Sequence, residues 1–165
     1  MPRRVTVRGG AHTAAMTRWD PWAALAETDI ELWYEPLVGQ RGRWARAGDL
    51  EEIVLEETLD RRTRRAVLAH ELVHAERRIG RPSATVATMQ LEEERVWRAA
   101  LDRLAPPEEV RRFVGARASV GPVTVADLAD EFDLPLDLAE RLARLAIARQ
   151  LIGGPAPSAG GRPSG

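Results

Sequence analysis

The sequence predicts an α+β fold in which a small antiparallel sheet packs on a helix that carries an H-E-x-x-H motif, with further helices after it. Three observations indicate this class. Residues 30–56 contain short runs in which apolar and polar side chains alternate, the period of a half-buried strand. Residues 60–79 have helical spacing and contain the motif. Residues 90–150 keep helical spacing between breaks that contain proline.

Length and composition indicate one domain with loose ends. The chain has 165 residues, of which 44% are hydrophobic, so it is long enough for one core and short for two. Residues 1–18 have little apolar periodicity, and we expect a disordered arm there. Residues 151–165 are mostly Gly, Pro, Ala and Ser, which bury too little surface to fold, so we expect a disordered tail. The domain is therefore expected at 19–150, with a helical C-terminal part at 108–150.

Charge and cysteine content exclude several classes of function. The 24 basic residues, all arginine, balance 25 acidic ones, so no overall field attracts nucleic acid or an anionic membrane. There is no cysteine, so any metal must be held by His, Asp or Glu. No apolar run of membrane-spanning length and no export leader is present, and we expect a cytoplasmic protein. The use of arginine without lysine is typical of a GC-rich bacterium or its phage.

The first elements are a short helix and three strands. Asp20-Pro21 supplies an N-cap followed by proline at the first helical position. The runs 30–34, 42–46 and 52–56 read IELWY, GRWAR and EIVLE, and turn signals separate them. They predict a small antiparallel sheet directly ahead of the motif.

The central helix begins after Asp60, a suitable N-cap, and ends near Gly80. Its middle reads RRAVLAHELVHAERR, in which the only polar side chains between the flanking arginines and the last glutamate are His70, Glu71 and His74. A helix that is apolar nearly all round is normally buried on several sides. Later helices are expected at 90–104, 108–114, 124–131 and 135–150, after a Ser/Thr/Ala-rich loop at 83–88.

The motif has the spacing of a metal site. On a helix, His70 and His74 lie on one face with Cβ atoms about 5–6 Å apart, so both can bind one zinc ion at about 2.0–2.1 Å. Glu71 lies beside that face, where its carboxylate can take a proton from a water held by the metal. The alternative is a buried helix that carries the pattern by chance. Unpaired buried polar groups cost about 1–3 kcal/mol each, which favours a bound zinc ion.

A catalytic zinc normally has three protein ligands, so a third must come from elsewhere. Glu92, Glu93 and Glu94 open the next helix. Only Glu93 continues the apolar stripe that runs through Trp97 and Leu104, so we expect Glu93 as the third ligand and Glu94 as the second choice. An acidic first turn also stabilises a helix, which accounts for the other carboxylates.

The combination and order of these parts resemble the ImmA/IrrE family of metallo-endopeptidases. The matching parts are Leu59-Asp60 with the arginine-rich helix start, RRAVLAHELVHAE, which is similar to the family's RRFTLAHELGH, and EERVWRAALDRLAP, which is similar to its Glu-x-x-Ala helix ending at proline. The resemblance covers roughly residues 19–150. The chain differs at Val73, where the family commonly has glycine, and at Val96-Trp97, which replace Ala-Asn or Ala-Asp.

The resemblance implies a zincin-like domain and a peptide-bond hydrolase. It implies one zinc ion per chain held by His70, His74 and Glu93, with Glu71 as catalytic base. Family members typically cleave a helix-turn-helix transcriptional repressor of a phage, mobile element or stress response. The resemblance therefore implies a protein substrate of that kind.

Two other classes of function stay open. A non-catalytic protein that keeps the fold and binds a repressor would function without the Glu71 carboxylate. Residues 123–148 have the rhythm of a helix-turn-helix, which would suit a DNA-binding regulator. Asp127, Asp130 and Glu131 on its first helix oppose phosphate binding, so we expect this pair to pack on the domain and not to bind nucleic acid directly. The sequence leaves the oligomeric state open.

Overall fold

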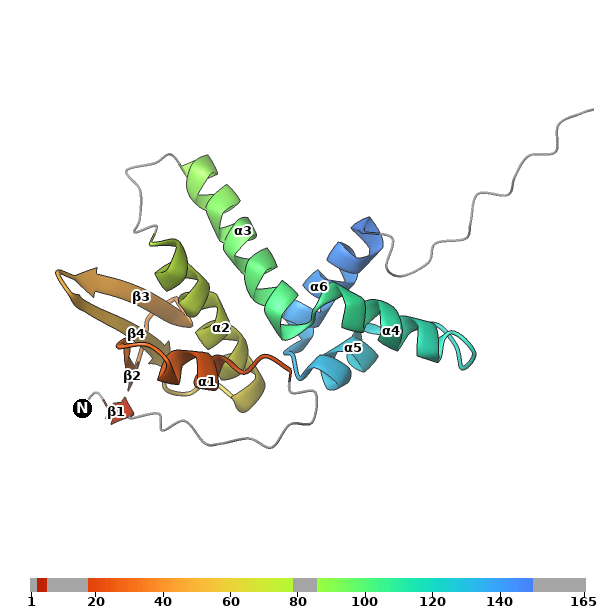
Figure 1. The fold of residues 1–165 in the computed structure, drawn as a ribbon, viewed down its shortest axis with the longest axis horizontal. Helices are drawn as coiled ribbons and strands as arrows, with labels where there is room; N and C mark the ends of the chain where they lie inside the picture. Colours follow the sequence, from red (N-terminus) through yellow and green to blue (C-terminus); the bar gives the residue numbers. More distant parts are fainter. Residues whose placement is uncertain (1–2, 6–17, 79–85, 150–165) are drawn as a thin grey trace, which may run out of the picture.

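The structure is a computed structural model that describes residues 3–5, 18–78 and 86–149, the first of these as backbone. In Figure 1 the strands lie on one side of α2 and the later helices on the other. In chain order the elements are β1 Arg3–Val5, α1 Pro21–Ala26, β2 Glu31–Glu35, β3 Gly42–Ala47, β4 Leu50–Glu56, α2 Arg61–Arg77, α3 Val86–Leu104, α4 Pro107–Arg117, α5 Val125–Phe132 and α6 Leu136–Ala148. Apart from the short helix α1, which lies between β1 and β2, the strands come before the helices, so the fold is mixed α+β.

The sheet is mixed, so the predicted all-antiparallel sheet is wrong. Its strand order is β1-β2-β4-β3. β3 and β4 form an antiparallel hairpin whose turn contains Gly48 at φ 64°, a backbone conformation that glycine adopts without a steric penalty. Two chain reversals separate β2 from β4, so these strands run in the same direction and pair in parallel. Since β2 lies next to β4, strand β3 is left at the edge of the sheet.

The N-terminal segment differs from the expected arm at residues 3–5. These residues form β1, which pairs antiparallel with β2. Pairing with the outer edge of β2 satisfies backbone N–H and C=O groups, a gain that side-chain periodicity does not reveal. The rest of the expected arm, residues 6–17, and the expected tail at 151–165 lie outside the described residues.

Helix boundaries follow local capping signals. The Asp60 carboxylate accepts a hydrogen bond from the Thr63 backbone N–H at 3.0 Å, which confirms the predicted N-cap of α2. The helix stops at Arg78, whose backbone is left-handed at φ 49°. α3 begins at Val86 and not at residue 90, so the expected loop at 83–88 is too long at its C-terminal end. None of the helices in the described ranges is long and apolar enough to cross a membrane.

Helix α2 is buried between two clusters of apolar side chains. The first cluster joins α2 to the sheet and α1 through Leu25, Leu32, Ile53, Leu55, Val67, Leu68 and Leu72. The second joins the opposite side of α2 to the helices after it through residues that include Ala66, Ala69, Val73, Val96, Leu101, Leu104, Leu128 and Phe132. Each large side chain that is fully buried contributes about 1.5–3 kcal/mol. Packing on both sides explains why the helix is apolar nearly all round, and it holds the motif on a rigid element.

Candidate metal centre

Three side chains that the sequence singled out converge between α2 and α3. Ligand atoms of His70, His74 and Glu93 all lie within 4.8 Å of one another. The Nε2 atoms of the two histidines are 3.0 Å apart. Each Nε2 lies 3.2 Å from one carboxylate oxygen of Glu93. This group can hold a metal ion.

The spacing of these atoms fits a small divalent cation. In a tetrahedral site with bonds of about 2.0–2.1 Å, neighbouring ligand atoms lie about 3.3 Å apart. The contacts of 3.0–3.2 Å among His70, His74 and Glu93 are close to that value. Two imidazole nitrogens and a carboxylate oxygen form a donor set that suits zinc and related metals.

The neighbouring carboxylates are engaged elsewhere. Glu92 pairs with Arg77 of α2 at 2.7 Å. Glu94, the second choice from the sequence, pairs with Arg141 of α6. Only the middle residue of the acidic run, Glu93, therefore reaches the two histidines.

Glu71 lies beside this group and is only 5% exposed. The backbone N–H of Trp44 in β3 donates a hydrogen bond to its carboxylate. Burial raises the pKa of Glu71 to about 7, against the opposing effects of the His74 charge and of this hydrogen bond. The carboxylate is thus held by the edge strand in a place where it binds a proton readily.

Gly42 allows the edge strand to approach α2 this closely. A Cβ atom at this position would lie 2.5 Å from Cγ1 of Val67 and 3.0 Å from Oε1 of Glu71. Sequence reasoning did not single out Gly42. The available signal was a glycine at the start of a predicted strand, where it marks a close backbone approach.

The electrostatics of His70 and Glu93 favour the protonation states that bind metal, whereas those of His74 favour its protonated form. Burial lowers the pKa of His70. Burial also acts to lower the pKa of His74, but the hydrogen bond to Glu93 and the negative charge of Glu71 outweigh it, so this pKa is raised. Hydrogen bonds from both histidines lower the pKa of Glu93 well below its usual range. Glu93 is thus a carboxylate and His70 a neutral imidazole near neutral pH, as metal ligands require.

The imidazole of His70 is held by a stacked ring. Its centroid lies 4.1 Å from that of Trp97, with an angle of 30° between the planes. The His70 Nδ1 atom is buried and has no hydrogen-bond partner among the described residues. A metal-bound histidine usually donates from its second nitrogen to an acceptor. In this chain packing against Trp97 orients the ring, a contact that sequence reasoning missed, although it placed Trp97 and Glu93 on one stripe.

A groove of about 970 Å³ opens on the metal group. Its lining comes from β3 and the turns at its ends, from the C-terminal half of α2 and from the first turns of α3. The residues are Gln40, Gly42, Arg43, Trp44, Ala45, Arg46, Gly48, His70, Glu71, His74, Arg78, Met89, Glu92 and Glu93. Within the described ranges, the groove-side edge of β3 has no strand partner.

No family model, curated protein or solved structure matches the chain. The resemblance to the ImmA/IrrE family therefore rests on the motifs and their order along the sequence.

The helix pair α5 and α6 packs on the rest of the domain. Arg117 at the end of α4 pairs with Asp127 of α5 at 2.6 Å. Arg149, after α6, pairs with Asp102 of α3 at 2.6 Å. Further pairs join the start of α2 to Asp130 and to Asp133, which follows α5. These contacts show that the pair packs on α2, α3 and α4.

Proposed function

We propose that this chain is a zinc-dependent metallo-endopeptidase of ImmA/IrrE type with a zincin-like fold. His70, His74 and Glu93 hold one zinc ion, and Glu71 acts as the base. One observation carries the proposal: three ligand atoms lie within 4.8 Å of one another, beside a buried carboxylate and on the lining of an open groove.

The chain's own residues supply proton transfer in the proposed hydrolysis. When bound, zinc supplies Lewis acidity for a peptide carbonyl and for a water molecule. The Glu71 carboxylate takes a proton from the attacking water, whose oxygen forms a bond to the carbonyl carbon. Glu71 then gives this proton to the nitrogen of the leaving amine as the C–N bond breaks. The Trp44 N–H and the close approach of Gly42 hold the Glu71 carboxylate in place during both transfers.

The edge strand supports a peptide as the substrate. An extended peptide can add to an open sheet edge through backbone hydrogen bonds. β3 offers such an edge along the groove, and Gly42 and Trp44, which contact Glu71, belong to it. A peptide paired with β3 would run along the groove past the metal group, with its backbone hydrogen-bonded to the backbone of β3.

The resemblance also supports a particular partner. We propose that the substrate is a helix-turn-helix repressor of a phage, mobile element or stress response, and that its cleavage releases transcription. This part of the proposal rests on the family resemblance alone.

Metal content and cleavage test the proposed function together. Zinc per chain is measured by mass spectrometry for the native chain and for His70→Ala, Glu93→Ala and Glu94→Ala. We expect about one zinc in the native chain, loss of zinc in the first two variants, and retention in Glu94→Ala, the matched control. No zinc in the native chain after reconstitution would overturn the proposal.

Cleavage of a synthetic peptide library by the zinc-loaded chain tests the base. Glu71→Gln should keep zinc and lose at least about 100-fold in rate, the contribution of a general base. Undiminished cleavage by Glu71→Gln would rule out its role. Zinc binding without any cleavage by the native chain would favour the non-catalytic repressor-binding alternative.

A further inference from the structure

We propose that Arg78 and Met89 form a subsite of the groove that binds a carboxylate of the substrate, with the fit best for a glutamate side chain. The inference rests on the proposed peptidase function and names a preference that the metal group does not itself require. It is carried by the position of the two residues, by the charges along the groove and by the backbone of Arg78.

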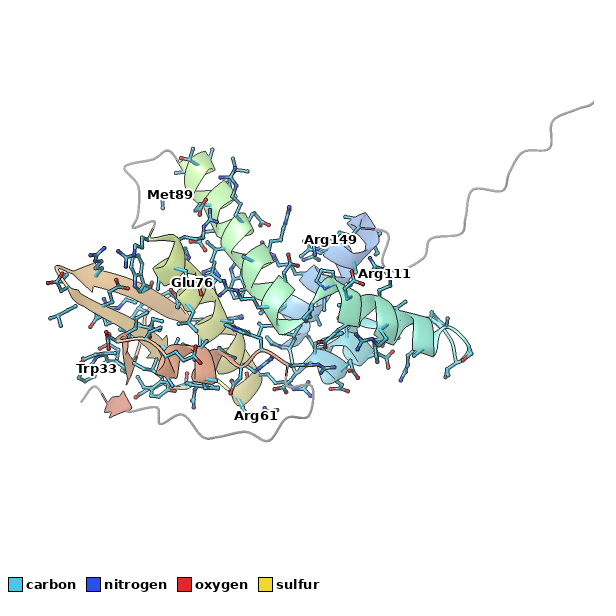
Figure 2. The ribbon with its side chains drawn as sticks, viewed as in Figure 1. Trp33, Arg61, Glu76, Met89, Arg111 and Arg149 are labelled. Atoms are coloured by element: carbon cyan, nitrogen blue, oxygen red, sulfur yellow. The ribbon has the colours of Figure 1, made fainter. Side chains whose placement is uncertain are left out.

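The two residues flank the metal group at matching distances. Arg78, the C-cap residue directly after α2, follows His74 by four residues, and Met89 precedes Glu93 by four residues on α3, so each lies about one helical turn, about 5.4 Å, beyond a ligand. Both line the groove. Figure 2 shows Met89 near the N-terminal end of α3, on the side toward α2. An extended peptide advances about 3.3 Å per residue, so the subsite faces a side chain about two residues from the scissile bond.

Arg78 is the groove arginine whose charge is open to a substrate. Arg43 pairs with Glu35 at 3.0 Å, and Arg46 lies 3.7 Å from Glu51. Arg78 is exposed, and no residue in the described part of the chain forms an ion pair with it. A guanidinium on the wall of a groove, with no ion-pair partner among the described residues, suits a carboxylate, which it can bind through two parallel hydrogen bonds.

The backbone of Arg78 gives an independent reason to assign it a role. Its φ of 49° and ψ of 25° place it in the left-handed region that ends many helices. Glycine is the usual residue there because it has no Cβ to clash with the backbone. An arginine at this position is a strained choice for a helix end, and strained residues that face a groove are often functional.

Met89 sets the length of the substrate side chain that the subsite prefers. It is 39% exposed, so part of its flexible thioether chain faces the groove and can adapt to an apolar surface. The methylene groups of a glutamate can pack on Met89 while its carboxylate reaches Arg78. Aspartate has one methylene fewer and gains less from this contact.

The test measures which peptides of a synthetic library are cleaved by the full zinc-loaded chain. Each peptide is made in two forms, one with a free C-terminus and one with an amidated C-terminus. The native chain should favour substrates with glutamate within about three positions of one side of the cut. Arg78→Gln should reduce this preference about 1.5- to 5-fold, as for an exposed ion pair, and Arg78→Glu should shift it toward lysine and arginine. A preference confined to free C-termini would identify the terminal carboxylate as the ligand and overturn the glutamate assignment.

Two control variants distinguish a failure of the subsite from a failure of the proposed peptidase function. Arg78→Gly suits the left-handed backbone, so it should fold with an unchanged or higher unfolding midpoint and still lose the preference. Arg144→Gln, on the exposed surface of α6, should keep it. Cleavage without an acidic preference, or a preference that survives Arg78→Gln, would overturn the subsite alone. Absence of all metal-dependent cleavage would overturn the proposed function and the subsite with it.

Discussion

Gly42→Ala tests the close contact between the edge strand β3 and α2, the helix that carries the motif. The added Cβ would lie 2.5 Å from Cγ1 of Val67, 3.2 Å from Cδ2 of Leu55 and 3.0 Å from Oε1 of Glu71. Carbon atoms pack best at about 3.5–4.0 Å, so the contact with Val67 is too close by about 1 Å or more. Val67 is buried, and a β-branched side chain on a helix has essentially one χ1 rotamer. β3 must therefore move away from α2.

The expected cost is that of overpacking a well-filled core, about 1–3 kcal/mol in the free energy of unfolding. For a chain of this length, that corresponds to a fall of about 2–12 °C in the thermal midpoint, measured by circular dichroism. Movement of β3 also displaces the Trp44 N–H from Glu71, so peptide cleavage should fall while zinc content stays near that of the native chain. The three atoms nearest to the added Cβ belong to Val67, Glu71 and Leu55 and not to the candidate ligands.

Two variants check the reasoning for Gly42. Gly115→Ala in α4 meets no atom within 4 Å, so it should raise stability by up to about 1 kcal/mol, as alanine does in a helix. Val67→Ala removes the atom that would clash, so the penalty of Gly42→Ala should be smaller in that background. A Gly42→Ala chain with native stability and native cleavage would refute the close contact. An equal penalty in both Val67 backgrounds would refute its assigned cause.

Three other outcomes follow from the capping, stacking and ligand contacts. Asp60→Ala removes the side chain that accepts from Thr63 and should lower the free energy of unfolding by about 0.5–2 kcal/mol with no loss of zinc; a lower zinc content would contradict a purely capping role. Trp97→Leu removes the ring that stacks on His70 and should weaken zinc binding by up to about tenfold, measured by competition with a chelator. Trp97→Phe keeps an aromatic ring and should come close to the native zinc affinity. Equal zinc affinities in all three chains would argue against the stacking role. Zinc should slow amide hydrogen exchange in residues 86–93, where few side chains are buried, and leave the core of α2 unchanged; uniform slowing would contradict a local effect.

The local features of the site were predictable because each depends on neighbours in the sequence. The Asp60 cap and the i, i+4 spacing of His70 and His74 follow from helix geometry. Glu93 was separable from Glu94 because a helix presents only one residue of an acidic run to a given face. The structure agrees in placing Glu93 beside the two histidines, whereas Glu94 pairs with Arg141 of α6.

The features that escaped prediction depend on contacts between distant segments. Alternation in residues 30–34 identifies a strand but not its neighbour, so the parallel pairing of β2 with β4 had no local signal. The strand at residues 3–5 is defined by backbone pairing with β2. Gly42 and Trp97 show the same limit: a glycine or an aromatic residue is visible in the sequence, but the side chain that it meets on α2 is not.

The two helices that supply the candidate ligands are held in different ways. α2 is packed on both sides, by the sheet and by the later helices, so His70, Glu71 and His74 are fixed by the core. The buried residues of α3 are Val96, Ala100, Leu101 and Leu104, all C-terminal to Glu93. In the N-terminal half of α3, Glu92 pairs with Arg77 of α2, and Glu93 lies beside the two histidines of α2. A cation shared by the two helices would fix this half of α3, and with it the wall of the groove that carries Met89.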